Sequence, residues 1–392
     1  MLNRRIAIVG AGVAGTRLAY LLARHGIKTQ LFDHKAPWEK PCGGGLTAKV
    51  FNDFTDINRW DLNGRANYKM SVITPFGRRI VMTIDNPIVT VSRMRLGNIL
   101  LDEAIRAGVK FLPYRVKAIQ RRDDKIILHT ADKEYEADFV VGADGIHSIV
   151  RKTFASPLSR DDYFMAYGAL LREEVQMPIV IKFYKGYNGY AWIFPRFRET
   201  SVGIVLGKNT DRAIMLTELQ SFVNKEWSLS GLTPPSIDKP YARAIPSMRR
   251  ETFLQAIQCG GDWALLGDAS GAADPLTGEG LYYAFRTAEI LTKAIVSNDI
   301  DSYNWEWNKM ADISIGKVSK VVDLFYDSRT LRIMGFIMDY SQTARELIGE
   351  IISGIQGYDT LRSRMKDEAF QYVKETIWNL LAFKRSKQVN GG

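Results

Sequence analysis

The sequence is poor in the residues that build metal centres and disulfide frameworks. Its 392 residues include only two cysteines, Cys42 and Cys259, and four widely spaced histidines. Two cysteines cannot supply a four-cysteine metal site or a network of disulfides, and no histidine lies three or four residues from another. We therefore expect no metal site, and a chain that is suited to the reducing cytoplasm.

Long apolar stretches are also missing. No segment reaches the roughly 18–20 apolar residues that cross a bilayer, although 46% of the residues are hydrophobic. A strand-like run at residues 6–9 stands almost at the start, without a signal-peptide pattern before it. These features predict a globular, cytoplasmic protein of two or three domains.

Acidic residues are fewer than basic ones. Against 53 lysines and arginines stand 43 aspartates and glutamates, which gives a net charge of +10. A basic surface attracts nucleic acid, anionic membranes or anionic small molecules. Because no basic run is interleaved with aromatic residues in the manner of nucleic-acid-binding motifs, we expect no nucleic-acid partner. Peripheral contact with the anionic inner face of a membrane stays open.

The first 33 residues have the pattern of a dinucleotide-binding unit. An apolar run at residues 5–9 is followed by Gly10, Gly12, Gly15 and a helical stretch. In such units the glycines allow a tight turn, a close approach of the backbone to a pyrophosphate, and packing of helix against strand. The helix N-terminus attracts phosphates. Asp33 follows the second strand, where a carboxylate can bind ribose hydroxyls.

The pattern changes twice along the chain. Short strands with a period of two occupy much of residues 161–239 and predict an antiparallel sheet. A strand and helix of the first kind return at residues 263–297, and the rest reads as helical. We expect three parts: a discontinuous nucleotide-binding domain (1–70, 93–155 and 255–300), an antiparallel-sheet substrate domain (71–92 and 156–254) and a C-terminal helical region (301–392).

Two later segments resemble the second and third fingerprints of flavin-dependent hydroxylases. The first is Gly-Ala-Asp-Gly at residues 142–145, and the second is Gly-Asp-Ala at residues 267–269, whose aspartate in that family binds the ribityl chain of FAD. All three fingerprints occur in the expected order. The chain thus resembles the p-hydroxybenzoate hydroxylase-type FAD superfamily over about residues 1–300. The resemblance implies a Rossmann-like α/β domain of glutathione reductase type, with an inserted antiparallel β-sheet domain, and FAD as cofactor.

Within this superfamily, the loop Pro-Cys-Gly-Gly-Gly-Leu at residues 41–46 is similar to the signature of geranylgeranyl reductases, including archaeal digeranylgeranylglycerophospholipid reductases. Tyr-Ala-Trp-Ile-Phe-Pro-Arg at residues 190–196 matches their Y-x-W-x-F-P-K/R motif. The cysteine pair that archaeal members often carry further along is missing here. The resemblance implies cofactor contacts from Gly10, Gly12, Ala14, Gly15, Asp33, Cys42, Gly43, Gly44, Gly45, Arg93, Val116, Asp144, Gly145, Gly267, Asp268, Pro275, Gly280 and Leu281. It implies substrate contacts from Tyr190, Trp192, Phe194, Pro195 and Arg196.

Strand alternation puts Tyr190, Trp192 and Phe194 on one face. That face is either pocket wall, where the rings would support positive charge on a protonated isoprenoid, or ordinary core. Cys42 is a catalytic candidate, as a proton donor or redox thiol; the alternative is a buried spacer beside the flavin.

The helical region allows two interpretations. Trp305, Trp307 and the run Met-Gly-Phe-Ile-Met at residues 334–338 are either helical core or, because methionine fills irregular space, part of an apolar tunnel for a prenyl chain. The late basic residues Lys384, Arg385 and Lys387 are either a solvated tail or a contact to anionic lipid.

The resemblance implies an FAD-dependent oxidoreductase that saturates isoprenoid C=C bonds of a prenyl lipid, prenyl diphosphate or prenylated quinone, by hydride transfer from N5 of the reduced flavin. One alternative is a flavin monooxygenase or halogenase, although halogenases carry W-x-W-x-I-P where residues 190–195 differ at two specified positions. Another is a non-catalytic lipid-binding or electron-carrying flavoprotein. Only one complete phosphate-binding unit is visible, so the electron donor stays open between NAD(P)H, ferredoxin and another carrier protein.

Overall fold

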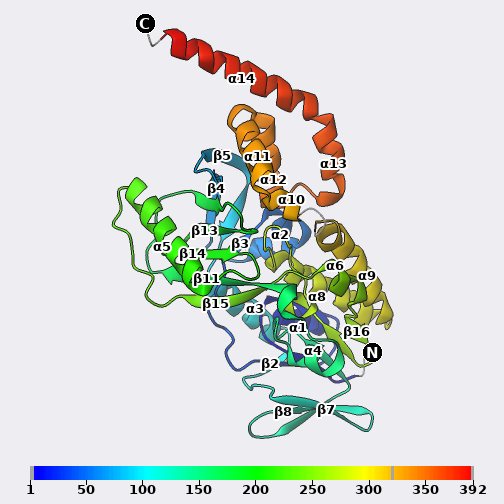
Figure 1. Ribbon diagram of the computed structural model, residues 1–392. Helices are drawn as coiled ribbons and strands as arrows, with labels where there is room; N and C mark the ends of the chain where they lie inside the picture. Colours follow the sequence, from blue (N-terminus) through cyan, green and yellow to red (C-terminus); the bar gives the residue numbers. More distant parts are fainter. Residues whose placement is uncertain (1–3, 319–321, 390–392) are drawn as a thin grey trace.

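The computed structural model describes residues 4–318 and 322–389 (Figure 1). One of its sheets is formed by β16 (Cys259–Gly260), β17 (Trp263–Leu265), β10 (Phe139–Gly142), β1 (Ile6–Val9), β2 (Thr29–Phe32) and β6 (Lys110–Leu112), in this order. Its neighbours run parallel, except for the pair β16–β17. Parallel sheets are covered on both faces, which explains why β1 reads as an unbroken apolar run. The predicted α/β class is confirmed.

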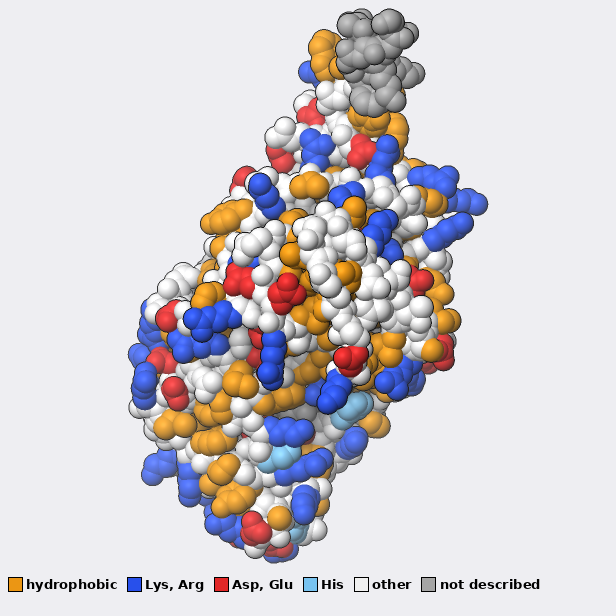
Figure 2. Space-filling model, turned by 90° about the vertical axis from the view of Figure 1, so that its left-hand side faces the viewer, with side chains coloured by type: hydrophobic (Ala, Val, Ile, Leu, Met, Phe, Trp, Pro, Cys, Tyr) orange, Lys and Arg blue, Asp and Glu red, His pale blue; other side chains and the backbone are white. Residues whose placement is uncertain are grey.

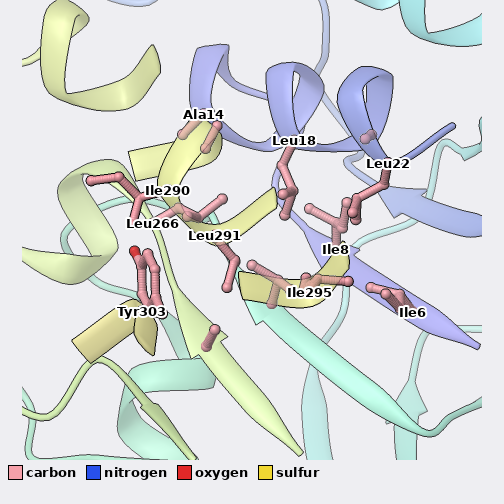
Figure 3. Close-up of a cluster of buried hydrophobic side chains, with 14 of the residues drawn as sticks. Ile6, Ile8, Ala14, Leu18, Leu22, Leu266, Ile290, Leu291, Ile295 and Tyr303 are labelled. Carbon is pink, nitrogen blue, oxygen red and sulfur yellow. The ribbon is translucent and has the colours of Figure 1, made fainter. Parts of the chain in front are cut away.

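The two faces of β1 belong to two different cores. Ile6 and Ile8 point to the helices, where they meet Leu18 and Leu22 of α1 (Val13–Arg24) and residues of α8 (Leu281–Val296) (Figure 3). Helices α3 (Arg93–Arg106) and α9 (Asp301–Ala311) extend this layer. Ala7 and Val9 point the other way, to α4 (Ile149–Phe154) and a small sheet of β7 (Ala118–Arg122), β8 (Lys125–His129) and β9 (Glu134–Ala137). Each fully buried aliphatic side chain contributes roughly 1.5–3 kcal/mol to this packing.

The second large sheet has eight strands. In order they are β15 (Tyr241–Pro246), β11 (Tyr163–Leu171), β14 (Glu199–Leu206), β13 (Gly189–Arg196), β12 (Ile179–Phe183), β4 (Arg65–Ile73), β5 (Arg79–Thr90) and β3 (Gly45–Leu46). All neighbours are antiparallel except β12 and β4, which pair in parallel from Ile179 opposite Met70. The sheet therefore takes in β3 and the start of β4, which lie before residue 71, where we expected its first segment to begin.

Helix α5 (Arg212–Leu229) covers one face of this sheet. Ala191 and Ile193 of β13 pack on that side, in a core with Phe222 and Trp227 of α5. Since side chains alternate along a strand, Tyr190, Trp192 and Phe194 face the opposite side, where the cavity described below lies.

The C-terminal region is helical, as expected. It consists of α10 (Val322–Tyr326), α11 (Ser328–Tyr340), α12 (Gln342–Ser353), α13 (Tyr358–Asp367) and α14 (Ala369–Val389). Helices α11 and α12 lie against β4 and β5, whereas α13 and α14 extend away from the rest of the molecule (Figure 1). Close packing depends on small residues, because a Cβ at Gly335 would lie 2.6 Å from Cγ2 of Thr74, and one at Gly349 would lie 2.8 Å from Cγ2 of Ile84.

Short helices complete the fold: α2 (Ala48–Asp53), α6 (Arg250–Gln255), α7 (Gly267–Ser270), two 3-10 helices (Thr55–Arg59 and Arg160–Asp162) and a π-helix (Asp312–Gly316). Within the described residues, no helix combines the length and apolarity that a membrane crossing requires. The surface view shows lysine and arginine side chains spread widely over one face (Figure 2).

Candidate active site

A cavity of about 1140 Å³ lies where the two large sheets meet. Its wall includes residues just beyond the carboxyl ends of β1, β2 and β10, the loop of residues 40–45 and the exposed face of the eight-stranded sheet. Ligands of open α/β sheets bind at the carboxyl ends of the strands. The volume exceeds the roughly 300–1,000 Å³ of an ordinary small-molecule pocket, so the cavity has room for a large cofactor together with a second molecule.

The three glycines after β1 differ in what surrounds them. Gly10 has a φ of +104°, and a Cβ there would lie 2.4 Å from the carbonyl oxygen of Ala143. A Cβ at Gly15 would lie 1.9 Å from the carbonyl oxygen of Gly10. At Gly12, by contrast, no described atom lies within 4 Å of the Cβ position, and the residue lines the cavity. The first and third glycines therefore serve packing, and the second leaves the backbone open to a ligand.

Polar groups in this part of the wall suit a dinucleotide. Asp33 Oδ2 accepts a hydrogen bond from the N–H of Ala11 at 3.0 Å, which fixes the carboxylate at the end of β2. Asp144 Oδ1 and Arg93 Nε are buried and have no hydrogen-bond partner among the described residues. Burial also raises the pKa of Asp144. Because buried polar atoms in native proteins are nearly always paired, these two point to a polar ligand in the cavity.

A second polar group lies where the third fingerprint begins α7. Asp268 Oδ2 accepts a hydrogen bond from Lys40 Nζ at 2.8 Å, and both residues line the cavity. Lys40 belongs to the glycine-rich loop, so this ion pair joins two segments that are far apart in the sequence. Lys40 is a wall residue that the sequence motifs did not single out.

Arg196 holds the glycine-rich loop from behind. Its side chain is 1% exposed, its Nε donates to the carbonyl of Gly43 at 3.1 Å, and its guanidinium also donates to the carbonyl of Cys42. The charge is balanced by Glu39 and Glu199, each 3.0 Å from Nη1. Arg196 therefore does not line the cavity, in contrast to the predicted contact with substrate, because loop carbonyls and two carboxylates turn the side chain away.

Cys42 lies in the wall with its thiol beside two cations. Burial acts to raise the pKa of the thiol, but the positive charge of Arg93, the N–H of Gly44 and the charge of Arg196 outweigh it and hold the pKa below its ordinary value. The Gly44 N–H donates to Sγ at 3.3 Å. The thiolate, which is the reactive form of cysteine, is thus formed more readily here than at an ordinary buried cysteine.

Aromatic side chains of β13 form the next part of the wall. Tyr190, Trp192 and Phe194 all line the cavity. The Phe194 ring packs on the loop, where a Cβ at Gly43 would lie 2.8 Å from it. The Tyr190 hydroxyl donates to the carbonyl of Thr277, and Trp192 is largely buried. This face of β13 is therefore both pocket wall and core, since the three rings pack within the domain and also border the cavity.

Most predicted cofactor-binding residues lie in the wall of this cavity. They are Gly10, Gly12, Ala14, Asp33, Cys42, Gly43, Gly44, Gly45, Arg93, Val116, Asp144, Gly145, Gly267, Asp268, Gly280 and Leu281. Gly15 and Pro275 do not line it, and neither does Pro195 of the predicted substrate set. Gly15 instead makes the close backbone contact described above.

Beyond the aromatic rings the cavity becomes apolar. This part, which we name the apolar arm, is lined by Val72, Ile181, Phe183, Phe325, Leu331, Met334, Met338, Ile348, Ile351 and Ile352. Met334 and Met338 thus fit the tunnel interpretation, while Trp307 is fully buried in the core and Trp305 is 61% exposed. The isoleucines of α12 were not singled out in the sequence, although their spacing of three and four residues indicates one helix face.

Comparisons with known proteins agree with this arrangement. The FAD binding domain family matches residues 4–181. A geranylgeranyl diphosphate reductase of Rhodobacter capsulatus is 30% identical over 301 residues, which cover 71% of this chain and 71% of that protein. The chain belongs to the geranylgeranyl reductase family. FAD is therefore its cofactor, and it is an FAD-dependent oxidoreductase.

Further members of the geranylgeranyl reductase family are similar over most of the chain. A geranylgeranyl diphosphate reductase of Synechocystis is 27% identical, covering 78% of this chain and 81% of that protein. A digeranylgeranylglycerophospholipid reductase of Methanocaldococcus jannaschii is 25% identical, covering 78% of this chain and 82% of that protein.

Solved structures show that the fold is shared more widely. A geranylgeranyl bacteriochlorophyll reductase-like protein of Thermoplasma acidophilum superposes with a TM-score of 0.73 at 19% identity, over 93% of this chain and 98% of that one. A flavin-dependent brominase superposes with a TM-score of 0.66 at 16% identity, over 93% and 99%. At these sequence identities the similarity concerns the fold, which reductases and halogenases share.

Proposed function

We propose that this member of the geranylgeranyl reductase family saturates C=C bonds of an isoprenoid chain that enters the apolar arm. The substrate class is a prenyl lipid, a prenyl diphosphate or a prenylated quinone. The observation that carries the proposal is the continuity of one cavity, from the open backbone at Gly12 to the isoleucines of α12. A long wall made mostly of apolar side chains suits a hydrocarbon tail, because burial of that tail is favoured in proportion to its area.

The cofactor end of the cavity suits FAD. Gly12 and the N-terminus of α1 would receive the pyrophosphate, Asp33 a ribose, and Asp268 the ribityl chain. Arg93 Nε and Asp144 Oδ1, which are buried without a partner among the described residues, would form hydrogen bonds with the cofactor. When bound and reduced, FAD supplies a transferable hydride.

The remaining chemistry falls to side chains of this protein. An isolated alkene is not polarised, so it must gain a proton before it accepts a hydride. Cys42 Sγ lies on the loop and can hold a proton, whereas the Tyr190 hydroxyl is engaged with the Thr277 carbonyl. Faces of Tyr190, Trp192 and Phe194 would stabilise positive charge at the tertiary carbon by about 0.5–2 kcal/mol each. The apolar wall would limit the access of water to that carbon.

The test is anaerobic reduction of prenyl substrates by dithionite-reduced protein. Mass spectrometry of geranylgeranyl diphosphate, and of extracted lipids and quinones, should detect a gain of about two mass units for each bond reduced. Dithionite replaces either candidate donor, NAD(P)H or ferredoxin, so the result does not depend on which is physiological. In a parallel aerobic assay, oxygen uptake coupled to product would favour a monooxygenase instead. Prenyl binding without saturation in the anaerobic assay would favour a non-catalytic carrier.

A matched pair of variants on α11 tests the apolar arm. Met334→Trp fills the arm and should abolish saturation while FAD stays bound, whereas Ile333→Trp alters the neighbouring residue, which is 60% exposed outside the cavity. Equal turnover in both variants would contradict the proposal that the tail occupies the arm.

A further inference from the structure

Helix α14 extends away from the rest of the molecule (Figure 1), and its first half is attached to α11 and α12. Glu375 accepts hydrogen bonds from Ser341 Oγ at 2.7 Å and from the N–H of Thr343 at 3.1 Å, at the start of α12. Asn379 Nδ2 donates to the carbonyl of Tyr340 at 2.7 Å, at the end of α11. The helix is 21 residues long, or about 30 Å at 1.5 Å per residue. Its orientation relative to α11 and α12 is therefore fixed by polar contacts on one face.

The opposite face of α14 is apolar and exposed. The exposed fractions are 78% for Phe370, 56% for Val373, 53% for Ile377, 74% for Trp378 and 51% for Leu381. By helical spacing these positions form a stripe along one side of the helix, which also includes the exposed Lys374. Single exposed apolar residues are ordinary, but an aligned series that includes tryptophan marks a surface that contacts something apolar.

The charges of α14 indicate what that partner is. The one acidic residue among positions 369–389 is Glu375, whose carboxylate faces the body of the protein as described above. The other charged residues of α14 are basic. Lys374 is exposed, and Lys384, Arg385 and Lys387 follow in the sequence of the last turns, although their side chains are not among the described ones. A helix that combines exposed apolar residues with an excess of basic over acidic residues in its sequence is typical of a membrane interface. A second copy would bring like charges together, whereas an anionic bilayer attracts them.

The position of α14 relates this surface to the cavity. Helices α11 and α12, against which α14 packs, carry on their inner sides Met334, Met338 and Ile352 of the apolar arm. On the outer side of α11, Ile333 is 60% and Phe336 is 40% exposed. A bilayer in contact with α14 would thus lie close to the two helices that wall the arm.

We propose that α14 is an interfacial anchor, which holds the protein on an anionic lipid bilayer through its apolar stripe and its terminal cations. The helix lies along the bilayer surface and does not cross it. The anchor stands independently of the proposed reaction, because it follows from α14 alone. If the proposed reaction is also correct, the anchor brings the apolar arm to the phase in which isoprenoid lipids dissolve.

The test is flotation of the full-length, FAD-loaded protein with vesicles. The protein should float with vesicles of equimolar phosphatidylcholine and phosphatidylglycerol, and less with pure phosphatidylcholine. The double variant Trp378→Ser/Leu381→Ser should reduce the bound fraction roughly tenfold or more, since two anchoring side chains are lost. The matched control is Leu229→Ser at the end of α5, where the side chain is 65% exposed and lies outside the stripe.

The charge contribution has its own variant. Replacing Lys384, Arg385 and Lys387 by glutamine should weaken flotation with anionic vesicles and remove its salt dependence, while leaving binding to pure phosphatidylcholine unchanged. Flavin content and turnover with a detergent-dispersed prenyl substrate report that each variant is folded. Because flotation is measured without turnover, failure of the anchor and failure of the proposed reaction are distinguishable.

Two results would overturn the proposal. One is equal flotation of the parent protein and the Trp378→Ser/Leu381→Ser variant. The other is a parent protein that does not float but sediments as a dimer, which that double variant converts to a monomer. The stripe would then be an interface between copies of the chain.

Discussion

Replacing Gly12 by alanine separates binding of the cofactor from stability of the fold. Gly12 has a φ of −75°, which any residue adopts, and no described atom lies within 4 Å of its Cβ position. A new methyl group restricts the unfolded chain, which stabilises by about 0.4–1 kcal/mol, and alanine is a poorer N-cap than glycine by a similar amount. We therefore expect the unfolding free energy of the apoprotein to change by less than about 1 kcal/mol.

The affinity for FAD should respond far more strongly. The methyl group would occupy space through which the backbone approaches the pyrophosphate, so at least one hydrogen bond to a charged group is lost. Such a bond contributes about 1.5–3 kcal/mol, which corresponds to a rise in Kd of roughly 10- to 150-fold.

Gly15→Ala provides the contrast. Its Cβ would lie 1.9 Å from the carbonyl oxygen of Gly10, so α1 must move, and we expect the apoprotein to lose about 1–3 kcal/mol. The assays are urea unfolding of the flavin-free protein and titration with FAD, followed by flavin fluorescence. An unchanged Kd in Gly12→Ala, or a loss of apoprotein stability as large as in Gly15→Ala, would refute the assignment of Gly12 as the point of close approach.

Three further predictions concern the rest of the site. Alkylation of the apoprotein by iodoacetamide, measured by peptide mapping, should increase with pH. The midpoint at Cys42 should lie below the ordinary thiol pKa of about 8.5, whereas the midpoint at Cys259 should lie near 11, because burial raises the pKa of Cys259 to about 11. Equal midpoints would contradict the electrostatic account. Arg196→Met leaves two carboxylates without their partner and should cost roughly 3 kcal/mol in urea unfolding, against less than about 1 for Arg122→Met in a half-exposed ion pair; equal costs would show that burial of Arg196 does not matter. Trp192→Leu should lower turnover with FAD still bound, and unchanged turnover would exclude a role for this ring in the reaction.

The sequence motifs predicted local structure correctly because each motif depends only on residues that are close together in the chain. The glycines at 10, 12 and 15 depend on a turn and a helix within six residues. In the structure Gly10 has a φ of +104°, Gly15 packs against the backbone of Gly10, and Gly12 is open to the cavity. Tyr190, Trp192 and Phe194 of β13 face the cavity together, as predicted, because alternation along a strand depends only on the strand itself.

The surroundings of Arg196 could not be predicted from strand alternation. Alternation places it on the same strand face as Tyr190, but its side chain is captured by Glu39 and by loop carbonyls that are more than 150 residues away. The periodicity of a strand does not predict the ion-pair partner of a charged side chain, because that partner depends on which distant segment packs against the strand.

The sequence by itself determined the nucleotide-binding unit, the order of the fingerprints and the family, since each depends on residue types at fixed short spacings. Tertiary structure alone decided the shape of the substrate space. The parallel pairing of β4 with β12, and the packing of α11 and α12 on β4 and β5, bring residues 72 and 352 to one wall. The physical reason is that a cavity is the space left between packed elements, and its form depends on long-range contacts that no short segment specifies.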